Sequence, residues 1–254
     1  MAASQDTLHG FDSYEQLMAT ARERFALSDG VRALRSSTDE AFLEAFLLHF
    51  CSLGAQMTRP VETWIGRAAA RCAEIGLSEL ARALANHARA EAGHHLMMIA
   101  DVALLTARWN ARRRPSVSAD DLLSQPPSPG VLAYRQVHEG YIASSTPYAQ
   151  VAIEYEIEML PLRFGELLIR KCIDVLGTEI VPCLSFLTEH VELDAGHTRL
   201  NITLMKGMLR REPRSLWALT SAGAAALDAY AAFLSDCVRL ADEEVRKAHR
   251  PLAS

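Results

Sequence analysis

An eight-residue pattern occurs twice in this chain, as HARAEAGH at residues 87–94 and as HVELDAGH at residues 190–197. Each copy has the spacing His-x3-acid-x2-His, and the six residues are His87, Glu91, His94, His190, Asp194 and His197. In an α-helix, positions i, i+4 and i+7 lie on one face. Each copy therefore predicts a stripe of two imidazoles and a carboxylate, and two facing stripes can surround two metal ions. The alternative is that these side chains form buried hydrogen-bonded pairs, or a duplication kept for packing alone.

The composition favours an all-α protein. Of the 254 residues, 50% are hydrophobic and only 7% are aromatic, and strand-length runs of Val and Ile are rare. The net charge is −5, and the longest basic block is residues 112–114, ahead of Pro115. We expect this block to cap the C-terminal end of a helix, and we expect no nucleic-acid partner.

The sequence also predicts where the protein resides. No apolar run reaches the roughly 18 to 20 residues that a membrane-spanning helix needs, so no membrane partner is expected. The first residues have neither a charged nor an apolar segment of the kind that a secretory signal carries. The five cysteines have no CxxC spacing and lie in apolar helical stretches (Cys51, Cys72, Cys172, Cys183 and Cys237). We interpret them as buried free thiols of a cytoplasmic protein.

One domain is expected. Residues 1–12 are predicted to be a flexible tail, and residues 13–254 a single helical domain with a core over about 40–210. Long helices are predicted over 78–109, 148–176 and 179–209, so that the first and third carry the two stripes. The proline-rich loop 114–130 divides the chain into two halves, which makes an internal pseudo-twofold plausible.

Two divalent cations need further carboxylate ligands. The apolar segment before the second stripe contains Glu154, Glu156 and Glu158, where an unpaired charge is costly. Glu154 and Glu158 share a helix face, and Glu158 is the favoured ligand, with Glu156 expected to be solvated or in a salt bridge. If the chain turns back near residue 75, residues 56–65 lie opposite the first stripe, which makes Glu62 a weaker candidate and Gln56 another.

Iron is the metal that this set of ligands favours. Mixed imidazole and carboxylate ligands without a thiolate suit Fe or Mn, and an open position on iron binds O2. Zinc more often takes fewer ligands in a closed tetrahedron.

These residues resemble those of the haem-oxygenase-like diiron oxidases and oxygenases, over roughly residues 40–210. His190, Asp194 and His197 match the most specific element of that family, Glu91 and His94 match an earlier one, and Glu158 suits a Glu on an intermediate helix. Two departures stand out. No motif fixes the ligand from the first core helix (Glu62 or Gln56), and His87 stands where some members have Glu.

The resemblance implies a single-domain haem-oxygenase-like bundle of about seven helices. It also implies two Fe(II)/Fe(III) ions, with O2 as co-substrate, that oxidise a small amino-acid-like or fatty-acid-like substrate of specialised metabolism. Arg163 and Arg199 lie near the ligands in sequence, and we consider them as clamps for a substrate carboxylate. A homodimer is common for such folds.

Three other interpretations remain open at this point. A ferritin-like diiron protein uses two Glu-x2-His helices and two further Glu, which leaves His87 and His190 without a role. A metal-free relative in the manner of TenA uses a Cys or Glu in a pocket, for which Cys183 is the nearest thiol. The third interpretation is a non-catalytic helical partner that has kept part of an ancestral metal site.

Overall fold

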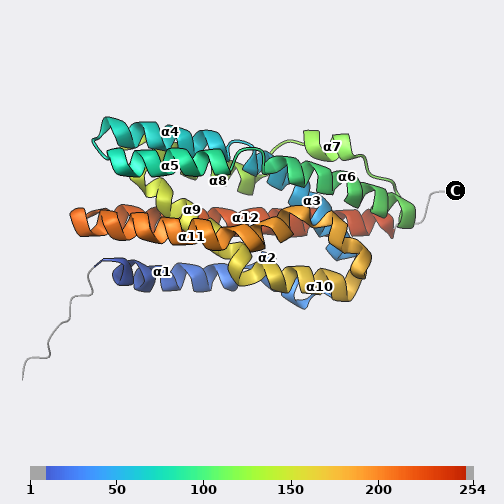
Figure 1. The fold of residues 1–254 in the computed structure, drawn as a ribbon. Coiled ribbons are helices and arrows are strands. Elements are labelled where there is room, and N and C mark those ends of the chain that lie inside the picture. Colours follow the sequence, from blue (N-terminus) through green and yellow to red (C-terminus); the bar gives the residue numbers. More distant parts are fainter. Residues whose placement is uncertain (1–9, 250–254) are drawn as a thin grey trace, which may run out of the picture.

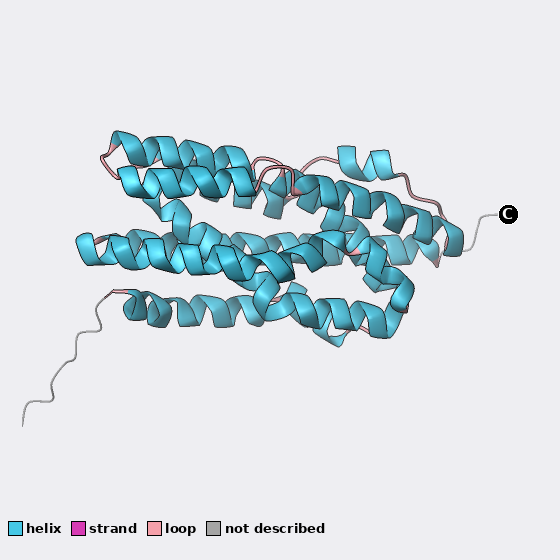
Figure 2. Cartoon of the chain, in the orientation of Figure 1, coloured by secondary structure: helices cyan, strands magenta, loops and turns pink. Residues whose placement is uncertain are grey.

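A computed structural model describes residues 10–249, except for the side chains of residues 193–195. The expected all-α fold is confirmed, since every regular element in these residues is helical (Figure 1, Figure 2). The helices are α1 (Phe11–Ala26), α2 (Asp29–Ser36), α3 (Glu40–Thr58), α4 (Val61–Glu74), α5 (Ser78–Ala90), α6 (His95–Arg112), α7 (Ala119–Ser124), α8 (Pro129–Ala143), η1 (Pro147–Ala149), α9 (Gln150–Leu160), η2 (Pro161–Gly165), α10 (Glu166–Leu176), η3 (Thr178–Cys183), α11 (Ser185–Arg211) and α12 (Ser215–Ala248).

Two of the predicted long helices are interrupted, so the described chain contains more helical segments than the expected seven. The predicted helix 78–109 breaks after Ala90, because Gly93 adopts φ of 85°, a left-handed conformation that glycine alone accepts readily. The predicted helix 148–176 widens into the π-helical turn η2 at Pro161, which has no N–H to donate to the preceding turn. The predicted helix 179–209 begins as the 3-10 helix η3, and the α-helix α11 starts at Ser185 and is continuous through the second motif.

The bundle is built around α3 and α12. Every residue from 42 to 55 of α3 is buried, as expected for a helix that is apolar on all sides. The last helix, α12, contacts α1, α2, α3, α8 and α9. In the view of Figure 1, α4, α5 and α6 form the upper row, α11 crosses the middle, and α1 and α10 lie along the bottom. Helix α11 therefore lies between the two rows, in contact with α6 and α9.

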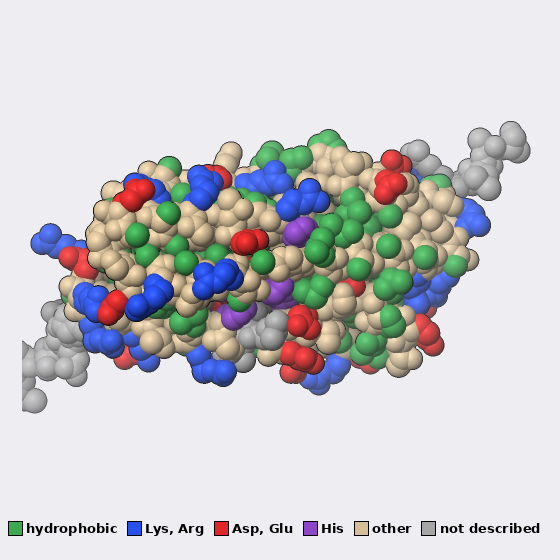
Figure 3. Space-filling view, turned by 45° about the horizontal axis from the view of Figure 1, so that its top comes forward, with side chains coloured by type: hydrophobic (Ala, Val, Ile, Leu, Met, Phe, Trp, Pro, Cys, Tyr) green, Lys and Arg blue, Asp and Glu red, His purple; other side chains and the backbone are tan. Residues whose placement is uncertain are grey.

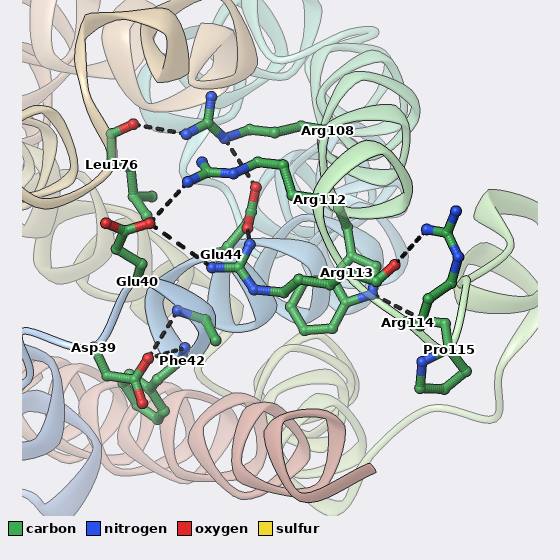
Figure 4. Close-up of polar contacts among 12 residues, drawn as sticks. Asp39, Glu40, Phe42, Glu44, Arg108, Arg112, Arg113, Arg114, Pro115 and Leu176 are labelled. Atoms are coloured by element: carbon green, nitrogen blue, oxygen red, sulfur yellow. Dashed lines mark hydrogen bonds and ion pairs between the residues drawn. The ribbon is translucent and has the colours of Figure 1, made fainter. Parts of the chain in front are cut away.

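A buried ion-pair cluster fixes α3 against α6 (Figure 4). The Glu44 carboxylate is fully buried, and its Oε1 lies 2.8 Å from Nε of Arg108 while its Oε2 contacts Arg113. Arg112 pairs with Glu40 at the surface, and Arg114 donates to the carbonyl oxygen of Asn110 at the end of α6. The basic block thus binds groups of this same chain, and Arg114 caps the helix end as expected.

The second buried pair joins α1 to α9. Glu156 is buried and accepts hydrogen bonds from Tyr14 (2.8 Å) and from Arg22 (2.7 and 2.9 Å). Its expected salt bridge is present, although it is buried and not at the surface. Arg22 also binds Glu15, whose pKa is lowered because these hydrogen bonds outweigh the effect of burial. The pair therefore fixes the helix that carries Glu154 and Glu158.

Further sequence expectations concern the termini, the cysteines and the membrane. The first helix begins at Phe11 and not at Ser13, and residues 1–9 of the predicted tail lie outside the described part. The division into a tail and one domain stays a prediction.

All five cysteines are buried and free. Within the described residues, no helix has the length and apolarity that crossing a membrane requires.

Candidate metal centre

The two motifs meet in opposite directions. The ring centroids of His87 and His197 are 4.9 Å apart, and those of His94 and His190 are also 4.9 Å apart. The first histidine of each motif therefore lies beside the last histidine of the other. Each candidate metal position draws ligands from both halves of the chain, in an arrangement consistent with a local twofold axis.

Position one is surrounded by His87, Glu91, Glu158 and His197, whose ligand atoms lie within 4.8 Å of one another. Nε2 of His87 is 2.7 Å from Oε1 of Glu158 and 3.6 Å from Oε1 of Glu91. Nδ1 of His197 is 3.2 Å from Oε1 of Glu91 and 3.6 Å from Oε1 of Glu158. Two imidazoles and two carboxylates thus converge from α5, α9, α11 and the break after α5.

Position two is surrounded by Glu91, His94 and His190. Nδ1 of His94 lies 3.0 Å from Oε2 of Glu91. Nδ1 of His190 lies 2.8 Å from the carbonyl oxygen of Phe186, which can only accept, so Nδ1 carries the hydrogen and Nε2 is left as the metal-binding atom. Asp194 is the remaining sequence candidate, and its side chain lies outside the described residues.

Glu91 belongs to both positions. Its Oε1 faces His87 and His197, while its Oε2 faces His94. A carboxylate that offers one oxygen to each of two groups is suited to bridge two cations. The break in the helix after Ala90 brings Glu91 into this place. Gly93 of the first motif permits that break through its positive φ.

The electrostatics of the cluster favour cations. Burial lowers the pKa of His87, but the carboxylates of Glu158 and Glu91 outweigh it and raise that pKa to about 11. Burial alone would raise the pKa of Glu91, yet the three neighbouring histidines hold it well below its usual range. Burial raises the pKa of Glu158 despite the opposing effect of His87. The metal-free cluster therefore holds protons where metal ions would otherwise neutralise the carboxylates.

Several buried polar atoms of the cluster have few partners. Nδ1 of His87 has none among the described residues, and the contacts printed for Nε2 of His87, Nδ1 of His94 and Oε1 of Glu158 are all with other members of the cluster. Leaving buried polar atoms unpaired is costly, and such atoms usually have a partner. Metal ions of borderline character bind imidazole and carboxylate together, so the donor set fits the expected pair of cations.

The other predicted carboxylate and amide ligands lie outside these two groups, as far as the described residues show. Glu154 is buried one turn before Glu158, where burial raises its pKa to about 8, and its Oε1 accepts from Gln150 at 2.5 Å. Glu62 is exposed on α4. Gln56 donates to the carbonyl oxygen of Gln125. None of the three joins a group of ligand atoms.

The two proposed substrate clamps are surface residues. Arg163 and Arg199 are both exposed, and the charge of Arg163 contributes to lowering the pKa of Glu15 on α1. Neither arginine lines the large apolar cavity described below. Their role as carboxylate clamps stays a prediction.

Asn201 is a residue of the centre that the sequence analysis missed. It is fully buried on α11, and its Nδ2 donates a hydrogen bond of 2.6 Å to Oε2 of Glu158. Its position is four residues after His197, so it continues the stripe of His190, Asp194 and His197. That extended spacing was the signal in the sequence. The bond leaves Oε1 of Glu158 directed at His87 and His197.

Replacing Asn201 with alanine is expected to weaken metal binding at position one by about 10- to 100-fold, the usual loss when a partner that orients a ligand is removed. The check is the dissociation constant for Fe(II), measured anaerobically. Thr203→Ala is the matched control, because Thr203 is exposed on the same helix and bonds only to the carbonyl oxygen of Arg199. Equal affinity in both variants would contradict the role assigned to Asn201.

An apolar cavity of about 420 Å³ lies beside the centre. Its wall includes Leu160 and Pro161, which follow Glu158, and Phe186 and Leu187, which precede His190 by about one turn. The rings of Phe186 and His190 are 3.9 Å apart between centroids. Phe186, in the wall of the cavity, therefore also contacts a candidate ligand of position two. On the face shown in Figure 3, histidine side chains also reach the surface beside a patch of apolar side chains.

Comparisons with solved structures identify the architecture. A domain of unknown function with a haem-oxygenase-like fold from Shewanella denitrificans superimposes with a TM-score of 0.74 and 15% identity, over 96% of this chain and 98% of that one. The fold is haem-oxygenase-like. A CADD-like protein of unknown function from Nostoc punctiforme is similar with a TM-score of 0.63 and 11% identity, over 90% of this chain and 98% of that one. No protein-family model matches the sequence, and neither does any curated protein.

This haem-oxygenase-like fold bears on two of the alternatives. Similarity over almost the whole chain favours this architecture over the ferritin-like one, and His87 and His190 both lie in the clusters. For the metal-free alternative, Cys183 is buried, and burial raises the pKa of its thiol, which disfavours the reactive thiolate.

Proposed function

We propose that this haem-oxygenase-like protein is a non-haem diiron oxidase or oxygenase that uses O2 to oxidise a small organic substrate. The observation that carries the proposal is the pair of buried His/Glu groups that share Glu91. Two Fe(II) ions, when bound, supply the electrons that reduce O2 and the oxidising power that acts on the substrate.

The residues of the chain have separate roles in this proposal. His87, Glu91, Glu158 and His197 hold one ion, and Glu91, His94 and His190 hold the other, with Asp194 as a further ligand. The hydrogen bond from His190 to the Phe186 carbonyl keeps Nε2 free of a proton for the metal. Glu91, His94 and His190 would hold the second ion, and the apolar side chains of the neighbouring cavity would keep water away from it.

The test is an anaerobic titration of the metal-free protein with Fe(II), followed by exposure to O2. The proposal expects two irons per chain and rapid, iron-dependent O2 consumption that substrate accelerates. One iron without O2 consumption would favour a mononuclear or impaired site. Absence of binding at micromolar Fe(II) would contradict the proposal and favour a non-catalytic helical partner.

Replacing Glu158 with glutamine is expected to abolish iron-dependent O2 consumption, because the amide lacks the charge that position one offers to a cation. Glu156→Gln is the matched control. Glu156 lies two residues away on α9, and its glutamine can still accept from Tyr14 and Arg22. O2 consumption is followed with an oxygen electrode, and the helical content by circular dichroism. The reverse order of losses would show that the wrong face of α9 had been assigned to the metal.

A further inference from the structure

Trp64 on α4 is buried, yet its ring nitrogen reaches a surface carboxylate. Nε1 of Trp64 donates a hydrogen bond of 2.9 Å to Oε1 of Glu139 on α8, whose side chain is 48% exposed. Arg67 donates to the same oxygen and lowers the pKa of Glu139. An indole that has lost an electron is a far stronger acid than indole itself, so Glu139 can still accept its proton. The hydrogen bond therefore makes Trp64 easier to oxidise.

The other two tryptophans of the chain lack this arrangement. Trp109 is fully buried on α6, and its Nε1 donates to the neutral carbonyl oxygen of Pro115. The guanidinium of Arg113 lies 5.2 Å from the Trp109 ring centroid, and a cation so close disfavours the loss of an electron. Trp217 is 79% exposed on α12. Of the three indoles, Trp64 is the one whose surroundings combine burial with a proton acceptor.

Trp64 also belongs to a buried group of three rings, which we call the ring stack (Trp64, His138 and Tyr134). His138 lies flat against Trp64, with ring centroids 4.2 Å apart and an angle of 12° between the planes. Tyr134 lies edge-on to both, 4.6 Å from His138 and 6.2 Å from Trp64 between centroids. Burial lowers the pKa of His138 to about 3, so this ring is neutral and adds no positive charge beside the indole. Electrons cross readily between neighbouring aromatic rings.

Two links lead from the ring stack to the metal centre. Nε2 of Gln150 lies 2.7 Å from Nδ1 of His138 and 2.5 Å from Oε1 of Glu154, which precedes Glu158 by one turn of α9. Tyr134 is the second link. Burial raises the pKa of Tyr134, and neighbouring carboxylates raise it further, among them Glu154 and Glu158. The stack therefore extends from the surroundings of a candidate metal ligand to a carboxylate at the surface.

We propose that the ring stack is a discharge path, which carries oxidising equivalents from the metal centre to the surface between α4 and α8 when no substrate is bound. This inference rests on the proposed function. In the step, the iron centre that has reacted with O2 gains one electron, Trp64 loses one, and the Nε1 proton of Trp64 moves to Glu139. A one-electron reductant in solution, such as ascorbate, then returns an electron to the indolyl radical, and Glu139 returns the proton. The histidine ligands are thereby spared from oxidation.

The radical is sought by electron paramagnetic resonance in iron-loaded protein that is frozen after mixing with O2, without substrate or reductant. An indolyl radical is expected, and incorporation of ring-deuterated tryptophan should narrow its signal. Trp64→Phe should lose this radical, whereas Trp109→Phe and Trp217→Phe should retain it, with circular dichroism to verify folding. A radical that persists in Trp64→Phe, or O2 consumption without any indolyl radical, would overturn the proposal.

Two further variants test the two ends of the path without removing the indole. Glu139→Gln can still accept the hydrogen bond but not the proton, so the protonated indole cation is expected, which has a different absorption spectrum from the neutral radical. Glu74→Gln is its control, because Glu74 is exposed on α4 and pairs with Arg71. Tyr134→Phe should slow radical formation in rapidly frozen samples, and Tyr141→Phe, on the same helix, should not. Equal behaviour of variants and controls would contradict the path.

Protection of the ligands is measured by mass spectrometry after repeated substrate-free turnover with ascorbate. Oxidised histidine is expected to accumulate faster in peptides 87–94 and 190–197 of Trp64→Phe than in those of Trp109→Phe. Equal damage in the two variants would count against a discharge path.

The outer end of the path is tested without iron. A photogenerated ruthenium(III) complex oxidises the metal-free Trp217→Phe protein, where Trp64 is expected to form the radical, and oxidation of Trp109 in its place would overturn the proposal. If iron does not bind or O2 is not consumed, the proposed function falls, and oxidation of Trp64 by ruthenium(III) still supports the outer end. If O2 is consumed while Trp64 stays reduced, only this inference falls.

Discussion

Replacing Glu91 with alanine is expected to remove both metal ions, whereas replacing His190 with alanine should remove only one. Glu91 offers one oxygen to the His87 and His197 side and the other to His94, so its loss takes a negative ligand from both positions. The affinity of each position should fall by more than about 100-fold, because even partners that only orient a ligand are worth 10- to 100-fold.

The measurement is the number of irons bound per chain in an anaerobic titration, with circular dichroism to verify folding. Glu79→Ala is a suitable control, because Glu79 is exposed on α5 and pairs only with Arg211. A Glu91→Ala variant that still bound one iron tightly would show that Glu91 does not bridge. The centre would then consist of two independent sites.

The largest effect on stability is expected for Glu44→Ala. The change leaves two arginines, Arg108 and Arg113, without the buried carboxylate that neutralises them. Removing one member of a buried ion pair typically costs 3–5 kcal/mol, and both arginines retain some access to water, so we expect a loss of about 3 kcal/mol. Urea unfolding followed by circular dichroism measures the free energy of unfolding.

Glu40→Ala is the matched control for this change. Glu40 lies one turn earlier on α3, is 51% exposed and pairs with Arg112. Surface ion pairs contribute only about 0–1 kcal/mol. A similar loss of stability in the two variants would show that the burial of Glu44 does not set its contribution.

The proximity of the ligands was predictable because helical spacing is a local property. His87 and Glu91, four residues apart, lie in one group of ligand atoms as expected, because that spacing fixes a position on a helix face. His190 and His197 lie in different groups. The crosswise pairing was not predictable, because it depends on the relative direction of α5 and α11. That direction is set by the packing of elements far apart in the chain.

The tripeptide Ala-Gly-His adopts two different backbone conformations in this chain. Ala-Gly-His occurs in both motifs, yet Gly93 breaks the helix with a positive φ, whereas Gly196 lies inside α11. Glycine permits the break without requiring it, so the surrounding tertiary structure decides.

The case of Glu62 shows the limit of arithmetic along a helical hairpin. The turn near residue 75 is present and α4 packs on α5, as expected. However, the distance from a turn gives only the height of a residue along its helix and not the direction of its side chain. Val61, Trp64 and Ile65 occupy the buried face of α4, which leaves Glu62 in solvent.

The first histidine of each motif lies beside the last histidine of the other. A metal ion bound there would therefore join residues that are far apart in the sequence. His87 and His197 are 110 positions apart (197 − 87), and an ion that joins them closes a loop of that length. Closing a long loop restricts the unfolded chain, and a ligand that binds only the folded chain raises its free energy of unfolding. With the proposed metals, iron supply then controls how long the folded protein survives proteolysis, in addition to its catalytic activity.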